Sequence, residues 1–174
     1  AALLPNLPSQ FKSQANAVNQ DGTVIVGLSQ QPAASRAAYW INGIAYDLGT
    51  LFDSPTQVTT NASATGVSAD GKTVVGNSEI SPGGFSHATL WNVPTPTAPT
   101  ATDLGTLTGT GSSHANGISS DGLVVVGQSD FVVGPATGQT AFRWTQATGM
   151  QSIPAWLNSA GVSMPAGWTL SSAS

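Results

Sequence analysis

The hydrophobic positions of the chain form short, unbroken β-branched runs rather than the spaced stripe of an amphipathic helix. An Asp-Gly pair shortly precedes each run and a glycine follows it, and the runs cover residues 24–26, 73–75 and 124–126. Asp-Gly supplies the backbone angles of a tight hairpin. An unbroken β-branched run is typical of a strand buried on both faces. The glycine that follows predicts a β-bulge or a close approach by neighbouring backbone.

This pattern occurs three times. Asp21, Asp70 and Asp121 stand 49 and 51 residues apart. A tryptophan follows in register in every copy, at positions 40, 91 and 144. The motif Asp-Leu-Gly-Thr-Leu then closes the first two copies, and residues 150–153 form a degenerate third version. Self-similarity at a fixed period indicates tandem repeats, and each copy here predicts four short strands with a buried tryptophan.

A four-strand unit of about fifty residues has the size of a propeller blade. We therefore expect an all-β fold, a β-propeller-like array of four-stranded antiparallel blades. A β-solenoid is the alternative, although its coils are usually shorter. Three blades are fewer than the roughly four to eight that close a ring, so the array is expected to be a partial or open ring. Further repeats or other copies of the chain would close it.

The repeat divides the chain into one domain with five parts. We expect residues 1–14 to hold the last strand of a preceding blade, because Leu4-Pro5-Asn6-Leu7 has the spacing of Leu-Gly-Thr-Leu. The three repeats are predicted at residues 15–63, 64–114 and 115–153. Residues 154–174 are predicted to form a short helix, with proline in its first turn and Gly161 at its end, and the start of a fourth repeat.

Composition narrows the possible partners. Only 7% of residues are charged and only four are Lys or Arg, so no basic stripe is available to track nucleic-acid phosphates. Nucleic acid is therefore excluded as a partner. No apolar run reaches the roughly 20 residues of a membrane span, so no membrane insertion by this segment is expected. The chain has no cysteine, which excludes disulfides and thiolate metal sites.

The combined pattern of Asp-Gly, Val-Val-Gly-x-Ser, Ala-x-x-Trp and Asp-Leu-Gly-x-Leu resembles the HAF-type bacterial extracellular repeat. The segment from Trp156 to Ala173 looks like the terminal repeat of the same family. The resemblance covers about residues 3–174 and implies an exported bacterial protein, extracellular or at the cell surface, in some cases an autotransporter passenger. It implies location and architecture rather than a reaction.

The acidic residues divide into two groups. Asp21, Asp70 and Asp121 are explained by turn formation, and one carboxylate per turn is too few for calcium. We therefore expect no metal site and no cofactor. The acids outside the repeat pattern, predicted in variable loops, are Asp53, Glu79 and Asp130. They are the candidates for an alternative function, an extracellular carbohydrate-active hydrolase with paired carboxylates.

The variable segments, at residues 30–35, 79–87 and 130–140, are expected on one face of the array, where repeat proteins often bind ligands. The binding candidates in them are Glu79, Phe85, His87, Asp130 and Phe131. No nucleophile elbow accompanies the histidines, so we expect them to be surface residues. The sequence thus favours a non-enzymatic binding, adhesion or scaffold module for a glycan or protein ligand.

Overall fold

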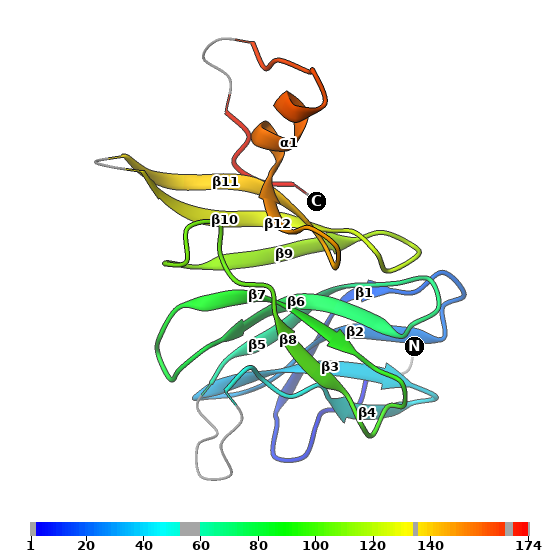
Figure 1. The fold of residues 1–174 in the computed structure, drawn as a ribbon. Coiled ribbons are helices and arrows are strands. Elements are labelled where there is room, and N and C mark those ends of the chain that lie inside the picture. The colour runs from blue at the N-terminus through cyan, green and yellow to red at the C-terminus, as the bar shows by residue number, and fades with distance from the viewer. Residues whose placement is uncertain (1–2, 53–59, 134–135, 166–168, 174) are drawn as a thin grey trace.

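The computed structural model describes residues 3–52, 60–133, 136–165 and 169–173. Its strands form three four-stranded antiparallel sheets in chain order, one for each repeat, as Figure 1 shows. Blade 1 contains β1 (Lys12–Val18), β2 (Val24–Gln31), β3 (Ala34–Ile41) and β4 (Ile44–Asp47). Blade 2 contains β5 (Ala62–Val67), β6 (Thr73–Glu79), β7 (Ser86–Asn92) and β8 (Thr100–Asp103). Blade 3 contains β9 (Ser113–Ile118), β10 (Val125–Val133), β11 (Ala136–Thr145) and β12 (Gly149–Ser152).

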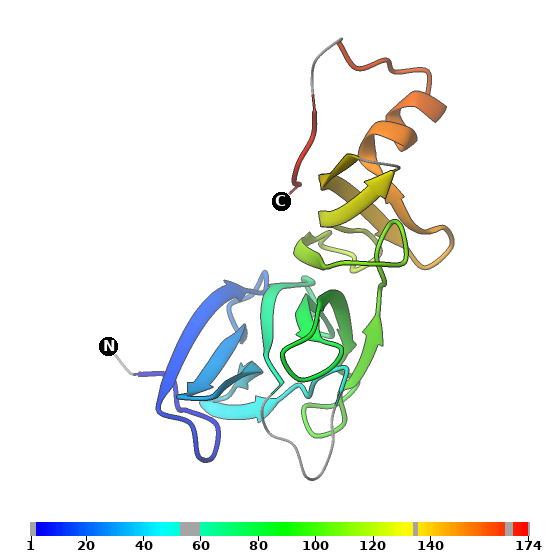
Figure 2. The same ribbon diagram turned by 90° about the vertical axis from the view of Figure 1, so that its left-hand side faces the viewer.

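The blades lie side by side with blade 2 in the middle (Figure 2). The first strand of each later blade packs on the blade before it: β5 contacts β1, β2 and β3, and β9 contacts β5, β6 and β7. Every sheet pairs its strands in the order of the sequence. This up-and-down arrangement confirms the predicted all-β, propeller-like array of four-stranded blades, and the ring is not closed.

The glycine after each β-branched run produces both features that it predicted. Ala15 pairs with Gly27 and Ala17 with Val26, which leaves Asn16 as an extra, bulged residue in β1. A β-carbon on Gly27 would collide with the backbone carbonyl of Gln14. Blades 2 and 3 repeat the arrangement at Gly76 and Gly127, so this close backbone approach is a constant of the fold.

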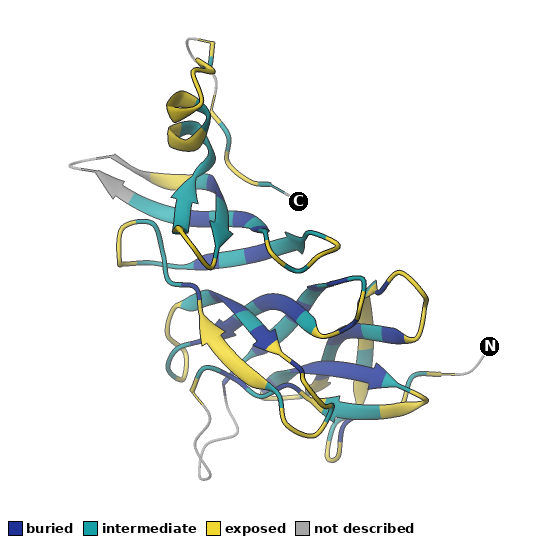
Figure 3. Cartoon of the chain, turned by 45° about the vertical axis from the view of Figure 1, so that its right-hand side comes forward, coloured by how far each residue is buried: buried dark blue, intermediate teal, exposed yellow. Residues whose placement is uncertain are grey.

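The hydrophobic core is divided into three clusters, of which two join neighbouring blades and the third packs the N-terminal connector on blade 1 through Leu7 and Trp40. One cluster joins blades 1 and 2 and contains Val24, Val26, Val74 and Trp91. A second joins blades 2 and 3 and is built from residues including Val75 and Phe142. Val74 and Val75 are both 0% exposed, on opposite faces of β6, so the central strand is buried on both sides as predicted (Figure 3).

The periodic tryptophans belong to this core. Trp40 and Trp91 are buried, and Trp144 packs partly buried against the cluster between blades 2 and 3. The Trp40 indole Nε1 donates to the Pro5 carbonyl at 2.7 Å. The prediction that these residues are blade core is confirmed.

The Leu-x-x-Leu element is a connector and not a strand. Among the described residues before β1, positions 3–11 contain no strand, and Lys12 to Gln14 already belong to β1. The predicted final strand at residues 1–14 is therefore wrong. The structural equivalence is nevertheless real, because Leu7 N donates to the buried Ser29 Oγ at 3.2 Å. The same bond joins Leu51 to Ser78 and Leu107 to Ser129.

The third blade ends in a helix, α1 (Ile153–Ser159). Ser152 caps it by accepting a hydrogen bond from Ala155 N, Pro154 lies in its first turn, and Gly161 follows with a φ of 77°. The helix contacts β11 and β12, and the Arg143 guanidinium lies 5.0 Å from the centre of the Trp156 ring. The helix predicted from Pro154 and Gly161 is present. No helix in the described part of the chain is long and apolar enough to cross a membrane.

Candidate functional site: the hairpin face

The variable segments of all three repeats connect the second and third strands of a blade. Antiparallel pairing places the β2–β3 hairpin beside the start of β1, since Lys12 pairs with Gln30, and beside the end of β4, since Ala38 pairs with Asp47. Blades 2 and 3 have the same topology. We call the side of the array that carries these hairpins and the inter-blade connectors the hairpin face. The Asp-Gly turns lie at the opposite ends of the strands.

Glu79 is a residue of β6 and not of a loop, which corrects the predicted position. Its carboxylate is buried and accepts hydrogen bonds from Asn61 N at 3.1 Å and Asn61 Nδ2 at 2.7 Å. Asn61 Oδ1 in turn accepts from Ser35 N, in the hairpin of blade 1, at 2.9 Å. Glu79 therefore orients an amide that joins two blades.

Asp130 occupies the equivalent position in blade 3, inside β10, so its predicted loop position is also wrong. It accepts from Ser112 N at 2.8 Å and from Gln139 Nε2 at 3.1 Å. Ser112 Oγ accepts from Ser86 N, in the hairpin of blade 2, at 3.3 Å. Each acid is thus engaged at its own contact between blades. Asp53, the third acid of the hydrolase alternative, lies outside the described residues.

His87 is a residue of β7 rather than of a loop or an exposed surface. Its Nδ1 lies 2.9 Å from both carboxylate oxygens of Asp103, across the β7–β8 pair. Blade 1 has a matching pair, Arg36 Nε to Asp47 Oδ2 at 2.9 Å. The His87 side chain is mostly buried, and its contact with Asp103 joins β7 to β8.

The two predicted aromatic residues differ in environment. Phe131 is half-buried and packs against Gly138, its partner across the β10–β11 hairpin. Phe85 is 58% exposed at the end of the hairpin of blade 2, where Ile80 N donates to its carbonyl at 3.1 Å. Of the five predicted binding residues, Phe85 presents the most exposed apolar surface in the described structure.

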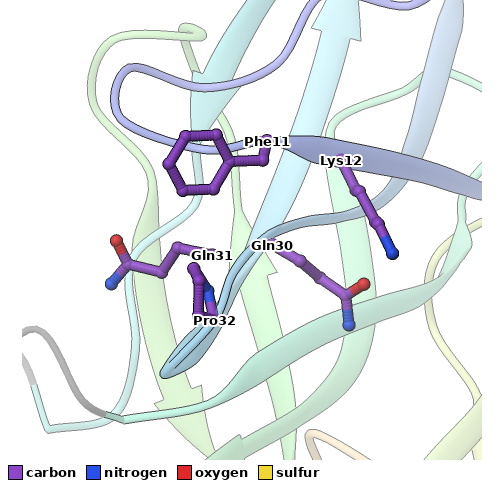
Figure 4. A pocket seen from close by; sticks show the side chains of 5 residues that line it. All are labelled: Phe11, Lys12, Gln30, Gln31 and Pro32. Atoms are coloured by element: carbon purple, nitrogen blue, oxygen red, sulfur yellow. The ribbon is translucent and has the colours of Figure 1, made fainter.

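A cavity of about 240 Å³ lies on the hairpin face of blade 1, lined in part by the predicted variable segment 30–35, although none of its lining residues is among the five predicted binding residues. Figure 4 shows the Phe11 ring above Gln31 and Pro32, with the Lys12 side chain extending beside that of Gln30. Phe11 is 71% exposed. Its only signal in the sequence is a departure from the repeat, because the equivalent positions hold Thr60 and Gly111.

The repeated aspartates on the opposite side stabilise turns, as predicted. Asp21, Asp70 and Asp121 each accept a hydrogen bond from the backbone N–H two residues on, at 2.9 to 3.0 Å. A hydrogen bond from the Ser68 hydroxyl, and then one from Lys72 N, hold the pKa of Asp70 below its ordinary value. In the described part of the chain, no three His, Asp or Glu side chains gather in an arrangement that would hold a metal ion.

The comparisons with known proteins show a similarity in fold and no match in sequence. Neither the protein-family models nor the curated proteins contain a match to this sequence. Among solved structures, the chain is similar to the crystal structure of TolB from Acinetobacter baumannii, with a TM-score of 0.52 and 12% identity. The match covers 78% of this chain and 31% of TolB, so the chain spans about a third of that protein's length. This likeness supports a β-propeller-type array of blades.

Proposed function

We propose that this chain is a non-enzymatic binding module of an exported bacterial repeat protein, and that it binds a protein or glycan ligand through the hairpin face. The proposal rests on one observation: the acidic residues of that face are held in hydrogen bonds, whereas the aromatic residue Phe85 is exposed. Glu79 and Asp130 are engaged in contacts between blades, whereas Phe85 stands exposed. Aromatic residues of this kind supply much of the binding energy at protein interfaces.

The arrangement of the hairpins supports this choice over catalysis. Paired carboxylates for glycoside hydrolysis must be available to substrate, about 5 to 10 Å apart. Here Glu79 and Asp130 each accept two hydrogen bonds from their own blade, and Asn61 and Ser112, which donate to them, bind the hairpin of the preceding blade. The hairpins also differ in length while the blades stay constant, and such variation on a rigid scaffold suits recognition of different ligands.

The HAF-type likeness supports export and a place outside the cell or on its surface. Autotransporter passenger is one form that this family implies. The low charge of the chain and its lack of cysteine accord with that location without requiring it.

The test is a screen of the labelled chain on glycan and bacterial surface-protein arrays, followed by the same screen with Phe85→Ala. We expect binding that Phe85→Ala weakens at least about tenfold, as for a central aromatic contact. Leu123→Ala is the matched control, since Leu123 is equally exposed but lies in an Asp-Gly turn on the opposite side.

A reducing-sugar assay on polysaccharides tests the alternative function, a carbohydrate-active hydrolase. Turnover that disappears in Glu79→Gln or Asp130→Asn, while the unfolding midpoint shows that the variant remains folded, would establish a hydrolase and overturn the binding proposal. Binding unaffected by Phe85→Ala would remove its main support.

A further inference from the structure

The contacts between blades on the hairpin face follow one scheme, which we call the inter-blade joint. In the joint of blades 1 and 2, Ser35 N of the hairpin donates to the Asn61 side chain, and Glu79 holds Asn61. In the joint of blades 2 and 3, Ser86 N donates to the Ser112 side chain, and Asp130 holds Ser112 through its backbone N–H. Each joint thus combines a hairpin N–H, an accepting side chain and an acid.

Blade 1 has the same position on its outer side, but with different chemistry. The equivalents of Asn61 and Glu79 are Lys12 and Gln30, which pair across β1 and β2. An ammonium group has donors and no acceptor, so Lys12 does not bind a hairpin N–H as Asn61 does. The acid of the joint is replaced by a neutral amide, and the local charge changes from negative to positive.

The burial of the residues around this position also differs between blade 1 and the other two blades. Thr60 is fully buried and Gly111 partly so, whereas the equivalent Phe11 is 71% exposed. In β1, Ala15 is likewise exposed, although its equivalents Ala64 and Ala115 lie in the clusters between blades. The outer side of blade 1 therefore has the shape of an inter-blade surface, with a cation and an aromatic ring at the joint.

We propose that this surface receives an adjoining propeller blade whose hairpin carries Asp or Glu at the position of Ser35. The carboxylate pairs with Lys12, and the hairpin covers the Phe11 ring. Both the continuity with the two joints present and the charge of Lys12 point to this occupant. The hairpins of this chain carry Ser35, Ser86 and Gln139 at that position. None of them supplies the carboxylate, so a second copy of the chain does not meet the requirement.

The probe is a cyclised peptide of residues 28–38, the chain's own blade 1 hairpin, made with Ser35→Glu, with Ser35 unchanged and with Ser35→Lys. Binding to the full, isotope-labelled chain is followed by NMR shifts of the Phe11, Lys12 and Gln30 amides. We expect the Ser35→Glu peptide to bind about two- to fivefold more tightly than the unchanged peptide, as for an exposed ion pair. The preference should fall with added salt, and the Ser35→Lys peptide should bind most weakly.

Variants of the chain show whether the peptides bind at Lys12 and Phe11. Lys12→Gln should abolish the preference for Ser35→Glu, and Phe11→Ser should weaken all three peptides. Lys72→Gln, which alters a lysine in an Asp-Gly turn, should leave the preference intact. A preference that is absent, or that persists in Lys12→Gln, overturns the proposal. So does a dimer of the unmodified chain that Lys12→Gln dissociates, because the occupant would then be a second copy, and so does glycan binding that Phe11→Ser removes. The ligand proposal is tested separately at Phe85, so either can fail alone.

Discussion

At the scale of single residues, the repeated aspartates illustrate how local chemistry shapes the blade. The Asp70 carboxylate accepts from Lys72 N at 3.0 Å and from the Ser68 hydroxyl at 2.7 Å. Asp121 makes the same two kinds of bond with Leu123 and Ser119. Such bonds favour the ionised carboxylate, and the pKa values of Asp21, Asp70 and Asp121 are all lowered by them.

These lowered pKa values predict an acid-dependent stability. A carboxyl group whose pKa is lower in the folded chain stabilises the fold above its unfolded pKa, near 3.8, and the contribution is lost as the pH falls through the folded value. We expect the midpoint of thermal unfolding to decrease below about pH 4. The triple variant Asp21→Asn, Asp70→Asn, Asp121→Asn should keep the turns, because Asn also accepts the backbone bond.

The measurement is the unfolding midpoint of both proteins between pH 6 and pH 2.5. The triple variant should show a smaller decrease than the unmodified chain. Parallel curves would show that the turn aspartates do not produce the acid sensitivity.

At the scale of elements, the bulge in the first strand of each blade links it to the next blade. The side chain of the bulged residue donates a hydrogen bond to a backbone carbonyl about one repeat later in the chain. Thr65 Oγ1 donates to Ala115 O at 2.7 Å, as Asn16 Nδ2 does to Ala64 O. Asn116 Nδ2 makes the same bond to Ala173 O at 3.0 Å. Ala173 thus takes the part that Ala64 and Ala115, residues of β5 and β9, take in the other two links.

Thr65→Val tests this link. Valine keeps the β-branched shape, but it removes the donor and leaves the carbonyl of the buried Ala115 short of a partner. We expect the free energy of unfolding to decrease by about 1 kcal/mol. Thr102→Val, on the exposed strand β8, is the control and should change it by less than about 0.5 kcal/mol. Equal effects in denaturant titrations would show that the link adds no stability.

At the scale of the whole molecule, the core is divided into three clusters, two between neighbouring blades and a third between blade 1 and the N-terminal connector. Figure 3 shows buried segments in all three blades. The array therefore resembles repeat proteins, whose stability is approximately a sum of terms from each repeat and from each interface between neighbours. A substitution that destabilises one interface should therefore affect the two blades beside it more than the third blade.

Phe142→Ala tests this expectation. Phe142 is fully buried between blades 2 and 3, so its truncation should cost about 3–5 kcal/mol. Hydrogen exchange should accelerate in β9 to β12 far more than in β1 to β4. The control is Phe85→Ala, an exposed phenylalanine. A uniform loss of protection across all three blades would show that the array unfolds as one unit.

Several predictions from the sequence hold because they depend on neighbouring residues. The Asp-Gly turns, the bulge opposite Gly27 and the cap of α1 at Ser152 involve residues that lie close in the chain or in adjacent strands. The buried tryptophans followed from the period itself. These features are properties of one repeat, and each repeat contains the information for them.

The hydrophobic pattern ends before Glu79, Asp130 and His87, and the sequence therefore predicts them in loops. The strands continue through them as paired residues, and the side chains find partners that no local pattern indicates: Glu79 binds Asn61, 18 residues earlier, and His87 faces Asp103, 16 residues later. Phe11 differs in type from Thr60 and Gly111 at the equivalent positions, and no motif of the repeat includes it. Its significance appears only when blade 1 is compared with the joints of the other blades.

The amino-acid sequence by itself determined the repeat, its four-stranded unit and its turns, since backbone angles and alternating burial act over a few residues. Only the tertiary structure decided which side chains of the hairpin face take part in contacts between blades and which are exposed. That distinction depends on contacts between blades, where a hairpin N–H meets a side chain that a carboxylate of the next blade holds in place. It assigns Glu79 and Asp130 to the joints and leaves Phe85 and Phe11 on the surface.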